Sequence, residues 1–129
     1  MNDNMMQNYT NKISPFDRKA IKLFTELGMQ KNIAKTLLYI SKNGGCKSVE
    51  IEQETNQRQP EVCAATNELL KKGWITKRDF KKKRKGRPVQ IYKLAYSINE
   101  IIAQIEIEKI QEFEKIKKEF SYLKNLVGK

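Results

Sequence analysis

The sequence predicts a mainly α-helical fold with a small β-hairpin and one long C-terminal helix. Apolar residues recur at helical spacing before residue 73 and again after residue 96, whereas they alternate with polar residues between these stretches. The chain has 129 residues, of which 39% are hydrophobic. This length and composition suit one modest core and one added element, and they do not suit a disordered chain.

The first predicted helix begins at Ser14 and ends at Gly28. Ser14 can cap the helix, Pro15 suits the first helical position, and Asp17 completes a capping box. Glycine is common just past a helix C-terminus, so Gly28 is a natural stop. The apolar residues at helical spacing in this segment are Phe16, Ala20, Leu23, Phe24 and Leu27.

Three more helices are expected before residue 73. The second spans about 31–42, the third about 49–55, and the fourth about 59–72 with Gly73 at its end. Asn56, in the turn between the third and fourth helices, suits a left-handed backbone conformation. On the fourth helix, we expect Val62, Thr66, Leu69 and Ala65 to face inward.

After Gly73, the spacing of apolar residues changes from the helical period to a period of two residues. Residues 74–80 are rich in strand formers, and residues 89–94 alternate apolar with polar side chains. The intervening segment 81–88 is basic, so the pattern predicts a β-hairpin with a long cationic tip. Residues 46–48 are long enough only for a strand stub.

The last segment, about 97–127, predicts a single helix about 45 Å long at 1.5 Å per residue. An apolar seam follows a heptad pattern, with a four-residue stutter near Lys109. Such a seam needs a partner surface, so we expect homodimerisation through it. The alternative is a helix that folds back on its own domain. The seam residues assigned to dimerisation are Ile98, Ile102, Ile105, Phe113, Ile116, Phe120 and Leu123.

The order of these elements predicts a winged helix-turn-helix domain at 13–95. A flexible arm precedes it at 1–12, and a coiled-coil-like dimerisation helix follows at 96–129. The helix at 59–72 would be the recognition helix of the helix-turn-helix, and the hairpin would be the wing beside it.

Charge favours a nucleic-acid partner. The chain has 26 Lys and Arg against 15 Asp and Glu, a net charge of +11. Eleven of the 26 cations lie in residues 71–93, where Asp79 is the single acid. A basic excess on one hairpin points to a polyanion, with nucleic acid first and an anionic membrane second.

Base readout is expected from the start of the fourth helix. Gln59 can pair with adenine and Arg58 with guanine, and Ala64 can touch a thymine methyl. Glu61 can accept from a cytosine amino group or only repel phosphates. The candidate residues of the helix and its turn are Gln57, Arg58, Gln59, Glu61, Ala64, Asn67 and Lys71. For each of them, plain surface exposure is the alternative reading.

The wing candidates are the cations of the hairpin tip. The lysines would contact phosphates without choosing a sequence, whereas Arg87, between a glycine and a proline, can enter a narrow minor groove. The residues are Lys81, Lys82, Lys83, Arg84, Lys85 and Arg87. A solvated loop tip is the alternative.

With these residues in view, the chain resembles archaeal winged-helix transcription regulators of the TrmB and MarR types. The resemblance covers about 70 residues and is carried most clearly by the step Leu69-Leu70-Lys71-Lys72-Gly73 and by the wing motif Gly86-Arg87-Pro88. It implies a dimer that binds promoters and controls transcription. Gln57 stands where an apolar turn residue is usual and Glu52 where a small one packs, so we expect a looser third helix or a Gln57 that reaches DNA.

Other functions fit less well. The chain has no histidine and no acid–base pair, phosphate loop or metal-ligand cluster in its sequence, so we expect no enzyme, no cofactor and no metal. No stretch approaches the roughly 18 apolar residues of a membrane span, which predicts a cytoplasmic protein. Cys46 and Cys63 are expected to act as small apolar residues, with a redox switch as the alternative. A protein-interaction module of the transcription machinery and an RNA-associated protein remain as rival functions.

Overall fold

The computed structural model describes residues 14–80 and 89–128. The predicted arm at 1–12 and the predicted wing tip therefore lie outside the described residues. The chain divides into two compact units, Met1–Ala95 and Tyr96–Lys129, and each is described by itself.

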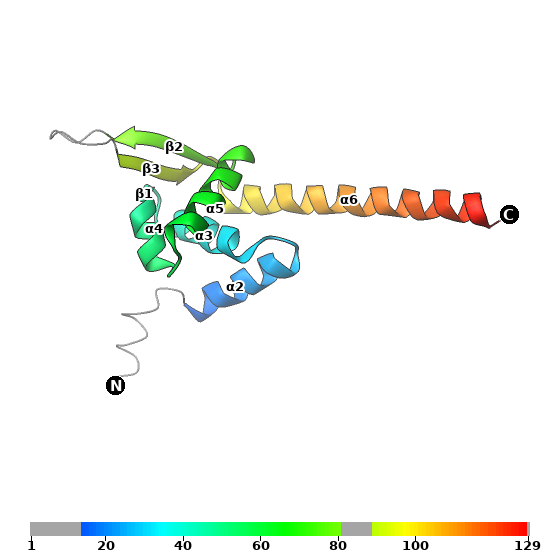
Figure 1. Cartoon of the computed structure of the whole chain (residues 1–129), viewed down its shortest axis with the longest axis horizontal. Coiled ribbons are helices and arrows are strands. Elements are labelled where there is room, and N and C mark those ends of the chain that lie inside the picture. Colours follow the sequence, from blue (N-terminus) through cyan, green and yellow to red (C-terminus); the bar gives the residue numbers. More distant parts are fainter. Residues whose placement is uncertain (1–13, 81–88, 129) are drawn as a thin grey trace. The chain divides into compact units, whose positions relative to one another are not determined.

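The described residues of the first unit contain four helices and a small sheet (Figure 1). The helices are α2 (Pro15–Glu26), α3 (Lys31–Lys42), α4 (Ser48–Glu54) and α5 (Gln59–Lys71). Each lies within two residues of its predicted bounds, so the mainly α-helical fold class is confirmed.

Local signals in the sequence fix where these helices begin and end. The Asp17 backbone N–H donates to Ser14 Oγ over 3.1 Å. In return, Asp17 Oδ2 accepts a hydrogen bond from the Ser14 backbone N–H, so the predicted capping box is present. Asn56 has φ 55° and Gly73 has φ 77°, both left-handed. These two residues reverse the chain before and after α5, where a β-branched residue would be strained.

The sheet has three antiparallel strands in the order β1-β3-β2. They are β1 (Cys46–Lys47), β2 (Ile75–Phe80) and β3 (Val89–Leu94). Phe80 pairs with Val89, so the segment 81–88 joins the two strands of the predicted hairpin. The strand stub before α4 becomes the third strand because it pairs with β3.

The core of the first unit lies between the helices and the inner face of the sheet. Its fully buried side chains include Leu37, Ile40, Ile51, Val62 and Leu69. The four residues predicted to face inward on α5 are all buried. Of the apolar residues on α2, Ile21 and Phe24 are buried, whereas Leu23 is 54% exposed, as is Leu27 just after the helix.

The second unit is the helix α6 (Ile98–Val127), capped by Ser97, whose Oγ accepts from the Glu100 N–H. Among its described side chains only Ile101 and Ile105 are buried. The predicted seam contained Ile105 but not Ile101, so burial in the first turns is centred on a different face from the seam. None of the helices in the described part of the chain combines the length and hydropathy that a bilayer crossing requires.

Replacing Ile51 with Ala should lower the free energy of unfolding by about 2–5 kcal/mol, because its fully buried side chain would leave a cavity. Val49 lies on the same short helix but is 48% exposed, so Val49→Ala should cost less than about 1 kcal/mol. Urea denaturation of both variants measures this difference. Equal losses would mean that α4 does not pack as described.

Candidate nucleic-acid interface

The helix-turn-helix pair consists of α4 and α5, and α5 is packed against α3. Val62, Ala65 and Leu69 are buried along one side of α5. The Asn32 side-chain amide on α3 also donates to the carbonyl oxygen of Glu61 over 3.2 Å. These contacts fix the rotation of α5 about its own axis, and so decide which residues point outward.

The opposite side of α5 is exposed. Ala64, Asn67 and Lys71 recur at three- and four-residue spacing and therefore share one face. Arg58 and Gln59, at the N-terminal end, are exposed as well. Glu61 is exposed too, so six of the seven helix and turn candidates are exposed, on one helix face and at its N-terminus.

Glu61 has a structural role that the sequence analysis missed. Its Oε1 accepts the backbone N–H of Arg58 over 2.8 Å, which is the return bond of a capping box. This carboxylate holds the first turn of α5 and lies in the position that favours an anion at a helix N-terminus. A capping carboxylate explains Glu61 without a contact to a cytosine.

The expectation that Gln57 contacts DNA is corrected. Its side chain is only 9% exposed. Its Nε2 donates to the hydroxyls of Thr55, over 2.7 Å, and Thr36, over 3.2 Å. Its Oε1 is buried with no hydrogen-bond partner among the described residues. Gln57 therefore connects the turn to Thr36 on α3 and to Thr55 just after α4.

The outer face of the sheet adds cations that the list of candidates omitted. Paired residues of antiparallel strands point to the same side, and Ile91 pairs with both Arg78 and Lys47. Lys93, two residues along β3, shares this face. Lys47 is 31 residues from Arg78 in sequence, so only the β1–β3 pairing brings it to the hairpin.

The six wing candidates at 81–87 lie outside the described residues, and their contacts stay predictions. The remaining five cations of the 71–93 segment are described, and all are exposed. They are Lys71, Lys72, Lys77, Arg78 and Lys93. The end of α5 and both strands of the hairpin therefore expose positive charge.

The two cysteines differ in environment. Cys46 is buried, its thiol donates to the Asn43 carbonyl oxygen, and burial raises its pKa to about 11. This agrees with the expectation of a small apolar residue. Cys63 is exposed on α5, so the same expectation is wrong for it. The Asn67 side-chain amide lies 3.7 Å from its Sγ.

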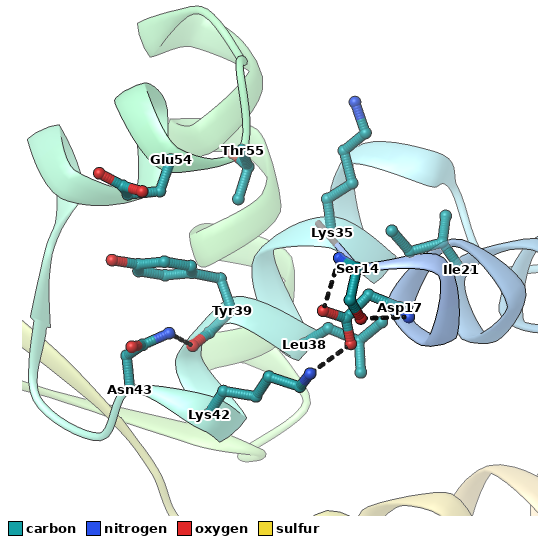
Figure 2. A pocket seen from close by; sticks show the side chains of 10 residues that line it. All are labelled: Ser14, Asp17, Ile21, Lys35, Leu38, Tyr39, Lys42, Asn43, Glu54 and Thr55. Carbon is teal, nitrogen blue, oxygen red and sulfur yellow. Dashed lines mark hydrogen bonds and ion pairs between the residues drawn. The ribbon is translucent and has the colours of Figure 1, made fainter. Parts of the chain in front are cut away.

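A cavity of about 410 Å³ lies among α2, α3 and the end of α4 (Figure 2). An ion pair between Asp17 and Lys42, with 2.6 Å between Oδ1 and Nζ, crosses one wall. Tyr39 and Glu54 line another part of it. No group of three or more potential ligand side chains in the described ranges is placed to hold a metal ion.

Two charged groups of this cavity have shifted pKa values. Burial alone would raise the pKa of Asp17, but the ion pair with Lys42 and the bond from Ser14 lower it. Burial lowers the pKa of Lys35, helped by repulsion from Lys31. The cavity holds two carboxylates and two ammonium groups, Lys35 among them, so it has no dominant charge.

The comparisons agree with this geometry. Residues 27–86 match the MarR family. This stretch includes α3, α4, α5 and β2, so the similarity to the MarR family covers the helix-turn-helix pair and the first strand of the hairpin. No curated protein matches the chain. The TrmB-type and archaeal parts of the resemblance stay predictions.

Solved structures show the same fold. The chain is similar to RV1404 from Mycobacterium tuberculosis, with 11% identity, a TM-score of 0.51, and coverage of 91% of this chain and 77% of that one. It is also similar to MepR, a transcription regulator of the Staphylococcus aureus multidrug efflux pump MepA, with 13% identity, a TM-score of 0.50, and coverage of 97% and 90%. A MarR family transcription regulator, SP03579, gives 14% identity, a TM-score of 0.50, and coverage of 96% and 76%.

Gln57 and Gln59 are two residues apart, but replacing each with Ala should change the free energy of unfolding by different amounts. Gln57→Ala removes the bonds to Thr36 and Thr55 and should lower the free energy of unfolding by about 1–3 kcal/mol. Gln59→Ala, at an exposed position, should change it by no more than about 0.5 kcal/mol. Thermal or urea denaturation gives both values. A stable Gln57→Ala protein would contradict the buried network.

The cysteines should differ in reactivity towards a maleimide or iodoacetamide at neutral pH. Cys63 should be modified quickly because it is exposed, whereas Cys46 should resist because it is buried and its pKa is raised to about 11. Mass spectrometry should find one adduct per native chain, none in Cys63→Ser, and one in Cys46→Ser. Two rapid adducts would show that β1 opens in solution.

Proposed function

Because residues 27–86 match the MarR family, we propose that this protein is a sequence-specific, double-stranded DNA-binding transcription regulator that acts as a homodimer. The observation that carries the proposal is the exposed face of α5, whose opposite face is locked into the core. A helix held in this way can enter the major groove without rearranging the domain.

The start of α5 supplies the chemistry for base readout. Gln59 can bond both N6 and N7 of an adenine, and Arg58 can bond O6 and N7 of a guanine. Ala64 leaves room for a thymine methyl. Asn67 and Lys71 lie further along the same face and suit the backbone. Gln57 is removed from this set because it is buried, and Glu61 because it caps the helix.

The hairpin supplies affinity that does not depend on sequence. Lys47, Arg78 and Lys93 on the outer face of the sheet extend the cationic surface of the proposed wing towards its base. In the proposal, the wing cations at 81–87 meet phosphates and Arg87 enters the minor groove. Contacts to phosphates release counterions, so binding should weaken steeply with salt.

One described feature favours the rival function of single-stranded RNA binding. Phe80 is 57% exposed, and it shares the outer face of the sheet with Arg78. An exposed aromatic ring beside cations can stack on unpaired bases. Duplex DNA, single-stranded DNA and RNA of one sequence should therefore be compared, with Phe80→Ala as the diagnostic variant.

Selection from random duplex DNA, followed by fluorescence anisotropy on the selected site, tests whether α5 reads bases and the hairpin contacts phosphates. Arg58→Ala or Gln59→Ala should change the preference at one base pair by about 1–3 kcal/mol. Arg87→Ala should instead weaken binding several-fold on all sequences. The logarithm of affinity should fall against the logarithm of salt with a slope near 0.9 per phosphate contact.

Lys19→Ala is the matched control, because it removes one exposed cation from α2. Its binding should stay close to that of the native chain. If all four variants lost affinity equally on every sequence, α5 would not read bases. Stronger binding to RNA than to duplex DNA, abolished by Phe80→Ala, would favour the RNA-associated function, and no nucleic-acid binding at all would favour an interaction module.

A further inference from the structure

The second half of α6 carries a row of apolar side chains that nothing in the described chain covers. We propose that residues 112–127 pair with the same segment of a second copy as a parallel, in-register, two-stranded coiled coil. This rests on the homodimer of the proposed function and adds the direction and register of the pairing. In Figure 1, α6 runs as one unbroken helix through this segment.

The apolar row has the spacing of a coiled-coil seam. Its residues follow one another at steps of three and four, which assigns them to the a and d positions of a heptad. Their exposed fractions run from 47% for Ile116 to 73% for Val127. The a residues are Phe113, Phe120 and Val127, and the d residues are Ile116 and Leu123. Such a row in water needs a partner surface.

The charges beside the seam are sorted by sign. In this frame the g positions hold Glu112, Glu119 and the uncharged Leu126, and the e positions hold Lys117 and Lys124, so the charged g residues are acidic and the e residues are basic. In a parallel pair, each g residue faces the e residue five positions later in the other helix. Glu112 then faces Lys117 of the second copy and Glu119 faces Lys124, so both pairs are of opposite sign.

An antiparallel pair would place g beside g and e beside e. Glutamates would then face glutamates and lysines would face lysines, which is repulsive on both flanks. The sorting of charges therefore selects the parallel direction. Residues on the far side of the helix, such as Glu114 and Lys118, are also exposed and take no part in the seam.

Contacts within the single helix do not prevent Glu112 and Lys117 from pairing with a second copy. Glu112 lies 3.4 Å from Lys109, but both side chains are largely exposed, and such a pair contributes little. Lys117 places its ammonium group 5.4 Å from the centre of the Phe113 ring. A lysine that covers an a-position ring with its stem suits the e position of a coiled coil.

The pairing has a defined beginning. From Ile105 to Lys109 and from Lys109 to Phe113 the seam takes two consecutive steps of four, which interrupts the heptad frame. Ile101 and Ile105, before this interruption, are already buried. The paired segment therefore starts after Lys109. Because both helices would run in the same direction, the N-terminal ends of both copies of α6 would lie at the same end of the pair.

Cross-linking of the full-length protein tests direction and register. In a Cys63→Ser background, Leu123→Cys should form a disulfide-linked dimer under mild oxidation, because identical d positions meet across a parallel pair. Lys118→Cys, on the opposite side of the helix, should cross-link about tenfold more slowly or not at all. Cross-linking of a Phe113→Cys chain to a Leu123→Cys chain, with neither linking to itself, would establish antiparallel pairing and overturn the proposal.

Charge reversal tests the sorting of signs. Glu112→Lys with Glu119→Lys places four lysines along the seam of each copy and should raise the dimer dissociation constant at least about tenfold at low salt. Adding Lys117→Glu and Lys124→Glu restores opposite pairs and should bring the constant back to within about threefold of native. Glu114→Lys, away from the seam, should have little effect. Circular dichroism checks that α6 stays helical in each variant.

Sedimentation and cross-linking are done without DNA, so their outcome is separate from the proposed function. A native chain that sediments as a monomer, or a four-site variant that fails to recover, would overturn the pairing even if DNA binding persisted. A cross-linked parallel dimer that binds no DNA would leave the pairing intact and reject the regulator.

Discussion

The packing of α5 against α3 decides what this protein can offer to a partner. Val62, Ala65 and Leu69 lie inside, and this burial fixes the rotation of the helix. Ala64, Asn67 and Lys71 then have to lie outside. The apolar contacts that stabilise the domain and the polar contacts proposed for DNA are thus opposite sides of the same helix, and a change in one side reorients the other.

A small polar network gives the recognition element its second constraint. Gln57 joins the turn before α5 to the hydroxyls of Thr36 on α3 and of Thr55 just after α4. Glu61 is exposed and closes the first turn of α5 by accepting from the Arg58 backbone N–H. The backbone that carries Arg58 and Gln59 is therefore held in place by hydrogen bonds of their neighbours.

The two halves of α6 differ in how exposed their apolar side chains are. Ile101 and Ile105 are buried, whereas the seam from Phe113 onward is exposed. The interruption of the heptad near Lys109 separates these two stretches. One helix can therefore bury apolar side chains near its start and expose an apolar row further along, because its apolar face rotates at the stutter.

Much of the fold follows from the sequence alone because helix periodicity, capping boxes and left-handed turn residues are local. Ser14 with Asp17, Asn56 and Gly73 predicted the ends of their helices, and the apolar spacing of α5 predicted its buried face. The sequence also determined the sorted charges along α6. Tertiary structure decided which polar side chains turn inward: Gln57 is buried because Thr36, 21 residues away, accepts its hydrogen bond. It also placed Lys47 beside Arg78 and exposed Leu23, since strand pairing and helix packing join residues that no local pattern connects.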